Sequence, residues 1–88
     1  MITSLSKRQI ESVDWIIRKR VISNGGKLKI AFGGGTSKEI EKIESLEVKN
    51  KSILINKISY YIKYIIDIFA DDKRIVSFTR KGEVVIFT

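Results

Sequence analysis

The stretch from Asn56 to Asp71, NKISYYIKYIIDIFAD, constrains this chain more than any other segment. At a helical repeat, most of its isoleucines fall on one stripe and its three tyrosines fall on the other side. The stripe consists of Ile58, Ile62, Ile65, Ile66 and Phe69, and the opposite side carries Lys57, Tyr60, Tyr61 and Tyr64. The pattern predicts an amphipathic helix that buries its isoleucines and offers its tyrosines to a partner, because solvent alone does not require tyrosine.

The residue types that are missing exclude most catalytic chemistry. The 88 residues contain no cysteine and no histidine, which removes disulfides, the usual zinc sites and nearly all nucleophile–base triads. Asp71, Asp72 and Lys73 cluster after the long apolar stretch, but neighbouring acids at that place are more typical of a solvated helix end. We therefore expect a protein that is not an enzyme and that uses no metal or other cofactor.

The length of the chain and its apolar runs indicate how many domains it forms and whether it enters a membrane. Residues 1–88 are expected to form a single domain. No apolar run approaches the roughly 20 residues that a membrane helix needs. The short polar segment from Met1 to Ser6 lacks the layout of a signal peptide. These features predict a cytoplasmic, intracellular protein with no membrane association.

The charge is basic and unevenly distributed. The net charge is +7, with 17 Lys and Arg against 10 Asp and Glu. Residues 1–35 and 57–88 hold the surplus, and residues 36–56 are balanced. A basic surplus suits a polyanion such as nucleic acid, although many small basic proteins bind nothing acidic. The abundance of Ile, Lys and Tyr and the lack of proline fit a virus or plasmid of an AT-rich host.

Residues 4–24 are predicted to form the first helix. Ser6 and Gln9 have the spacing of a capping box, and the stripe of Ile10, Val13, Ile17 and Val21 follows it. The apolar arc is wider than one small sheet requires, since Trp15 and Ile16 extend it. Either Trp15 or Ile16 contacts a second copy of the chain in a homodimer, or both lie at the margin of the core.

The middle of the chain is predicted as a strand, a turn and a helix, followed by an ambiguous segment. Residues 27–32, KLKIAF, alternate like a half-buried strand, and Gly33–Gly35 are expected to form a flexible turn rather than a nucleotide loop. Thr36 and Glu39 predict a second helix over residues 37–45. Residues 46–55 form either a small hairpin or the turn between two helices.

Residues 74–88 are predicted to form a hairpin. With Lys81-Gly82 as a two-residue turn, Arg80 faces Glu83, Phe78 faces Val85 and Val76 faces Phe87. This register leaves Val84 and Ile86 on the opposite face of the ribbon.

The predicted order of helix, strand, helix, long helix and hairpin resembles the winged helix-turn-helix family, and the phrase VSFTRKGEVVIF is similar to its wings. The resemblance implies a small α+β, winged-helix-like domain whose third helix enters the major groove of duplex DNA. It places these residues against nucleic acid: Lys51, Ser52, Asn56, Lys57, Tyr60, Tyr61, Tyr64, Arg80 and Lys81. The alternative fold, with a hairpin at 46–55, is a small antiparallel sheet with two helices on one face.

Two functions follow from these patterns. The first is a non-enzymatic domain that binds nucleic acid, duplex DNA more than RNA, as a homodimeric transcriptional regulator of a virus or plasmid. The alternative is a protein-interaction module, or an inhibitor of a host protein, that uses the tyrosine side of the helix predicted at 56–71.

Overall fold

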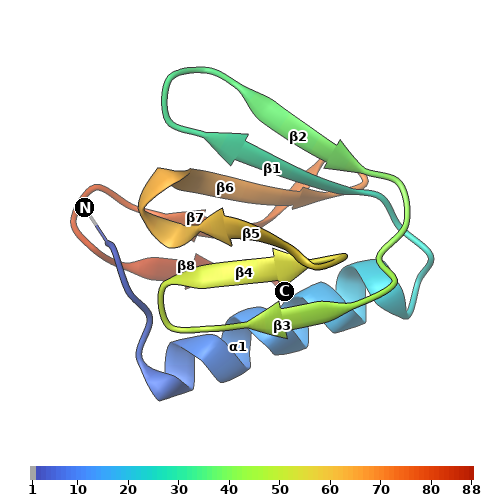
Figure 1. Ribbon diagram of the computed structural model, residues 1–88, viewed down its shortest axis with the longest axis horizontal. Helices are drawn as coiled ribbons and strands as arrows, with labels where there is room; N and C mark the ends of the chain where they lie inside the picture. Colours follow the sequence, from blue (N-terminus) through green and yellow to red (C-terminus); the bar gives the residue numbers. More distant parts are fainter. Residues whose placement is uncertain (1) are drawn as a thin grey trace.

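One helix is followed by eight strands in the computed structural model, which describes residues 2–88 (Figure 1). The elements are α1 (Lys7–Ile17), a π-helical turn η1 (Arg18–Ile22), β1 (Leu28–Phe32), β2 (Ser37–Ile40), β3 (Leu46–Val48), β4 (Ser52–Ile55), β5 (Ile58–Tyr61), a 3-10 turn η2 (Ile62–Tyr64), β6 (Ile65–Ala70), β7 (Lys73–Phe78) and β8 (Val84–Ile86). The class is α+β with mostly strands.

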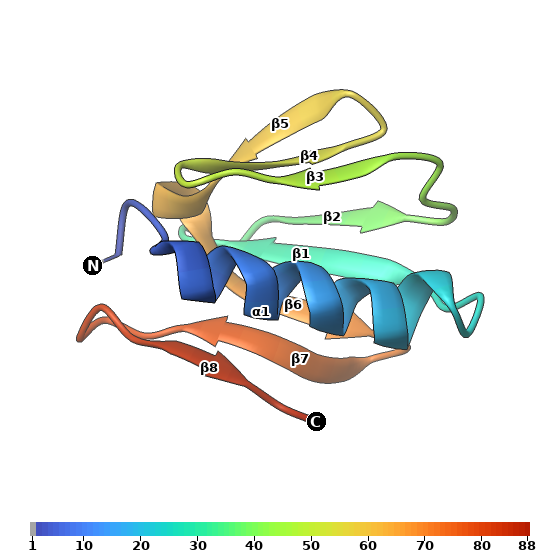
Figure 2. The ribbon, with the colours of Figure 1, turned by 90° about the horizontal axis from the view of Figure 1, so that it is seen from below.

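The strands form two antiparallel sheets. The larger has the order β2-β1-β6-β7-β8, and the smaller has the order β3-β4-β5. Helix α1 packs against β3, β7 and β8, so that it lies across the side where the two sheets diverge (Figure 2). The apolar stripe of the helix and the inner faces of both sheets enclose one hydrophobic core, with Ile16, Ile30, Ile53, Ile68 and Ile75 fully buried.

The predicted start of the first helix is confirmed. The Ser6 Oγ accepts a hydrogen bond from the Gln9 N–H at 3.2 Å, and the Gln9 side chain accepts one from the Ser6 N–H at 2.8 Å. Val13 and Ile17 of the predicted stripe are fully buried. Local capping and a clear helical period therefore agree with the tertiary packing here.

The helix predicted over Asn56–Asp71 is wrong. This segment forms β5, η2 and β6, and β6 lies between β1 and β7 in the larger sheet. Ile62 and Ile65 are buried as predicted, but Ile58 and Ile66 are 54% and 44% exposed. Isoleucine and tyrosine favour strands, and here this preference together with the pairing of β6 decides the structure.

Two tight turns bound the misassigned segment. Asn56 and Lys57 have φ of +52° and +68°, and Asp71 and Asp72 have φ of +49° and +65°. Two successive residues with positive φ are typical of the two-residue turns that join hairpin strands, and Asn and Asp tolerate this conformation best. These residues therefore end strands; the predicted helix cap at Asn56 and helix end at Asp71 are wrong.

The second predicted helix is also wrong, whereas the hairpin interpretation of 46–55 is confirmed. Residues 37–40 form strand β2 beside β1, and β3 pairs with β4 through Val48 and Ile53. With one helix and two antiparallel sheets, the resemblance to the winged helix-turn-helix family is wrong. The alternative of one sheet with two helices is wrong as well.

The C-terminal hairpin forms, but one residue out of the predicted register. Val76 pairs with Ile86, and Phe78 pairs with Val84. A longer loop causes the difference: the Thr79 N–H bonds the Glu83 carbonyl at 2.9 Å. A shift of one residue moves every side chain to the other face, so Val84 and Ile86 pack against the core.

Candidate nucleic-acid interface

Four chain segments meet at one end of the molecule, on the left in Figure 1. The Ile62 N–H bonds the Lys51 carbonyl at 2.9 Å, which joins the start of η2 to the β3–β4 turn. The Gly33 N–H bonds the Tyr64 carbonyl at 3.0 Å, which joins the β1–β2 turn to η2. The β7–β8 loop lies beside them and contributes Arg80 to the same hollow.

This end contains a hollow of about 370 Å³ between the β1–β2 turn, η2 and the β7–β8 loop. Its wall includes the Gly33-Gly34 backbone, Lys63, Tyr64 and Arg80, with Phe78 among its apolar members. Within the described part of the chain, no Asp or Glu lines it. The hollow thus combines two cations, an aromatic ring and exposed backbone, which are the groups that contact phosphates and bases.

Exposed aromatic rings stand at the edge of the hollow. Tyr61 and Tyr64 are 51% and 56% exposed, and their rings meet edge to face at 6.5 Å between centroids. The Lys63 Nζ lies 5.1 Å from the centroid of the Tyr64 ring, within the range of a cation–π contact. A lysine beside an outward aromatic ring offers a stacking surface and a positive charge to the same ligand.

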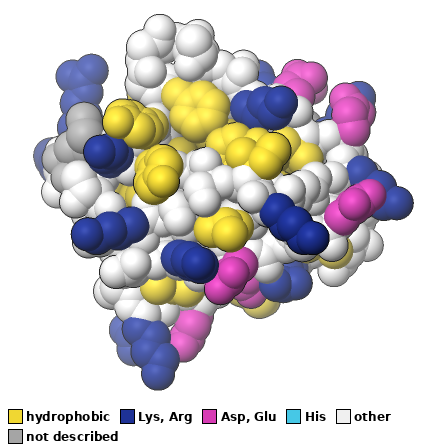
Figure 3. All heavy atoms as spheres, in the orientation of Figure 1, with side chains coloured by type: hydrophobic (Ala, Val, Ile, Leu, Met, Phe, Trp, Pro, Cys, Tyr) yellow, Lys and Arg dark blue, Asp and Glu magenta, His cyan; other side chains and the backbone are white. Residues whose placement is uncertain are grey.

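The charges around this end have one predominant sign. We call the set Lys51, Lys63, Arg80 and Lys81, with Tyr61 and Tyr64, the basic end. In the view of Figure 3, Lys and Arg side chains are spread over the whole face, whereas the Asp and Glu side chains lie to the right and below. The Asp71-Asp72 turn is held to Lys27 instead, where the Asp71 Oδ1 accepts a hydrogen bond from the Lys27 N–H at 3.1 Å.

The basic end contains five of the nine residues that the sequence analysis assigned to nucleic acid. They are Lys51, Tyr61, Tyr64, Arg80 and Lys81, and they come from the β3–β4 turn, the end of β5, η2 and the β7–β8 loop rather than from one helix and a wing. Ser52 and Tyr60 adjoin Lys51 and Tyr61 in the chain but are less exposed: Ser52 is buried, and the Tyr60 ring stacks on Phe32 at 6.3 Å and packs against the core.

Asn56 has a structural role in the fold rather than a place on an exposed helix. Its Oδ1 accepts hydrogen bonds from the Glu44 N–H at 2.6 Å and the Ser45 N–H at 3.2 Å. Its Nδ2 donates to the Lys42 carbonyl at 2.9 Å. The side chain therefore holds the loop before β3 against the β4–β5 turn, and the neighbouring Lys57 lies at this turn, far from the basic end (Figure 1).

Trp15 and Ile16, the two residues predicted at a homodimer contact, differ in exposure. Ile16 is fully buried, so that it offers no surface to a second copy of the chain. Trp15 is 48% exposed, and the Lys19 Nζ lies 4.9 Å from the centroid of its ring.

Sequence reasoning missed Lys63 and the Gly33-Gly34 backbone. The predicted helix left Lys63 without a role, and the glycines were interpreted as a plain turn. The usable signal was the adjacency of Lys63 to Tyr64, because a cation next to an exposed aromatic ring is common in single-strand binding sites.

Comparison of the chain with protein-family models, with curated proteins and with solved structures found no match. In residues 2–88, no helix has the length and apolar character needed to cross a membrane.

Proposed function

We propose that this domain binds single-stranded nucleic acid at the basic end. The observation that carries the proposal is the hollow in which Lys63, Tyr64 and Arg80 converge without a lining carboxylate in the described chain. Lysine and arginine neutralise phosphates, and a tyrosine ring stacks on any base. The sheet fold positions these side chains through turns that backbone hydrogen bonds hold together.

The shape of the site favours a single strand over a duplex. Duplex readout by the winged helix-turn-helix family requires a helix in the major groove, and the segment predicted as that helix forms two strands and a turn. Helix α1 places its apolar stripe on the core. A concave site with outward rings suits bases that are already unstacked, because a duplex encloses its base faces.

Binding is expected to weaken as the salt concentration rises, and the slope of log affinity against log salt concentration reports the number of phosphate contacts. A fluorescently labelled oligo-dT of about 12 nucleotides is titrated with the protein from about 50 to about 200 mM salt, beside a duplex of the same length. If three or four cations of the basic end contact phosphates, the log–log slope for the single strand is roughly −2 to −3.

The same titration contains the outcomes that contradict the proposal. Binding of the duplex more tightly than the single strand would exclude a site that stacks on bases. A slope near zero would exclude phosphate contacts by Lys51, Lys63, Arg80 and Lys81.

A further inference from the structure

Strand β8 has an unpaired edge. It is the last strand of the order β2-β1-β6-β7-β8, and it forms the lower border of the described chain in Figure 2. In an antiparallel pair, opposite residues alternate between those that exchange backbone hydrogen bonds and those that do not. Glu83 and Phe87 bond the residues opposite them, through the Glu83 carbonyl at 2.9 Å and the Phe87 N–H at 3.0 Å. The alternation therefore directs the backbone groups of Val84 and Ile86 away from β7.

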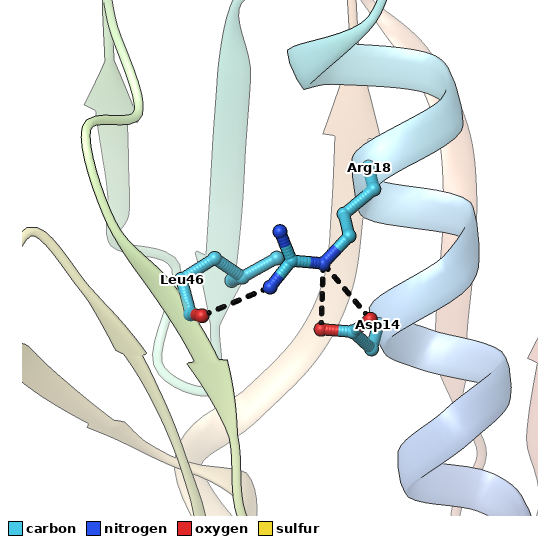
Figure 4. Close-up of polar contacts among 3 residues, drawn as sticks. All are labelled: Asp14, Arg18 and Leu46. Carbon is cyan, nitrogen blue, oxygen red and sulfur yellow. Dashed lines mark hydrogen bonds and ion pairs between the residues drawn. The ribbon is translucent and has the colours of Figure 1, made fainter.

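Two of the other sheet edges are protected against strand addition. At β3, the Leu46 carbonyl accepts a hydrogen bond from the Arg18 Nη2 at 3.1 Å, and the Arg18 Nε bonds both carboxylate oxygens of Asp14 at 3.1 and 2.9 Å (Figure 4). Strand β2 carries the exposed charges Lys38 and Glu39. A covering helix and edge charges are common means of preventing another strand from pairing.

The sequence of β8 lacks this protection. Glu83 is followed by Val-Val-Ile-Phe-Thr, without a charge or a proline, whereas the remaining edge strand, β5, lies between Lys57 and Lys63. Valine and isoleucine favour strands, and an uncharged edge with free N–H and C=O groups is a template for another strand. Strand β8 is therefore the edge most open to pairing.

We propose that β8 pairs with β8 of a second copy of the chain, antiparallel, about a twofold axis at Val85. In this register, Val84 lies opposite the partner's Ile86, and Ile86 lies opposite the partner's Val84. These are the residues whose backbone groups point outward, so both pairs exchange N–H to C=O hydrogen bonds. The pairing is isologous and joins the two larger sheets into one.

The charges beside the axis favour a second copy as the occupant. The register places Glu83 opposite the partner's Phe87, and directly opposite side chains lie on the same face of a sheet. The Arg74 guanidinium lies 5.9 Å from the centroid of the Phe87 ring in the same copy. Arg74 also bonds Asp67 at 3.4 Å and stays half-exposed. Each Glu83 carboxylate therefore approaches the partner's Arg74, once on each side of the axis.

The net charge of +7 opposes self-association, but the antiparallel register keeps the basic loops apart. Glu83 lies four positions along the ribbon from the partner's Glu83, about 14 Å at the rise of a strand. The Arg80-Lys81 loops lie beyond these residues, at opposite ends. This separation exceeds the Debye length of about 8 Å at physiological salt, so the repulsion between the loops is screened.

The test exchanges charges at the axis, in the absence of nucleic acid. Val85 is half-buried on the outer face, whereas Val84 and Ile86 pack against the core, so the fold tolerates a charge at Val85. Val85→Lys and Val85→Glu each place like charges opposite one another across the axis, and a mixture of the two variants places opposite charges there. Ser77→Lys is the matched control, because Ser77 lies opposite Val85 in β7, one strand away from the edge. Sedimentation velocity from about 5 to about 500 µM measures the association.

The wild-type protein and Ser77→Lys are expected to form a dimer with a Kd on the order of tens of micromolar, since the paired strand is short. Val85→Lys and Val85→Glu should each associate about tenfold more weakly, and their equimolar mixture should recover the dimer. A wild-type protein that stays monomeric over the whole range would overturn the proposal. A dimer that persists in both Val85 variants, or a mixture that associates no better than its components, would overturn it as well.

Discussion

Replacing Lys63 and Arg80 together by glutamate is expected to lower the affinity for single-stranded oligonucleotide about a hundredfold or more. Both side chains line the same hollow. Each charge-assisted hydrogen bond to a phosphate contributes about 1.5–3 kcal/mol, and two lost bonds multiply their effects. The introduced carboxylates would also repel the phosphates of the oligonucleotide. Fluorescence anisotropy at fixed salt measures the change.

A second charge reversal controls for net charge. Lys42 lies near Gly25 and Gly26, which follow η1, and Lys73 follows the β6–β7 turn. Both are exposed. Changing Lys42 and Lys73 to glutamate alters the net charge by the same amount and should reduce binding only slightly. If both double variants lose affinity equally while retaining the wild-type thermal transition, binding follows total charge and the basic end is not a site.

Changing Ile68 to alanine is expected to destabilise the fold by about 2–5 kcal/mol. The side chain is fully buried in β6, the central strand of the larger sheet. In a domain of this size, each kcal/mol lowers the Tm by about 4–8 °C. Urea or thermal unfolding followed by circular dichroism measures the effect.

The neighbouring Ile66 provides the matched control. It lies in the same strand but is 44% exposed, so Ile66→Ala should cost less than about 1 kcal/mol. If residues 56–71 formed a helix, Ile66→Ala would destabilise the fold more than Ile68→Ala, because the apolar stripe of that helix includes Ile66 and omits Ile68. A larger loss for Ile66→Ala than for Ile68→Ala would therefore contradict the strand assignment.

The first helix could be predicted because its determinants are local. The capping pair Ser6 and Gln9 lies three residues apart, and no distant strand competes for the segment. The strand from Leu28 was also predicted from alternation over a few residues. The same signal gave a hairpin at 46–55 as one of two alternatives.

The segment around β6 could not be predicted because its partners are distant in the sequence. Ile62, Ile65 and Ile68 are buried at intervals of three residues, which imitates a helical stripe. The intervals arise because η2 interrupts the strand direction, and because the pairing with β1 shifts between Ala31 and Phe32, opposite Ile66. A bulge changes which side chains face inward, and a single sequence window contains no sign of it.

The candidate site was partly predictable for a related reason. Aromatic and basic residues in the predicted helix and wing indicated an anionic partner, and Tyr61, Tyr64, Arg80 and Lys81 do lie at one end of the molecule. Their grouping depends on the hydrogen bonds of Ile62 and Gly33 across turns. The role of Asn56 as a clamp between loops likewise depends on contacts with Lys42, Glu44 and Ser45 that only the fold creates.

Backbone amide shifts in the ¹⁵N-labelled wild-type protein, recorded during titration with oligo-dT, test the basic end most directly. The account predicts progressive shifts of the Gly33, Gly34, Lys63, Tyr64 and Arg80 amides, which belong to the hollow. The amides of Asp71 and Asp72 at the opposite end should stay in place. Shifts centred on Asp71 and Asp72, or none at saturating oligonucleotide, would contradict the account.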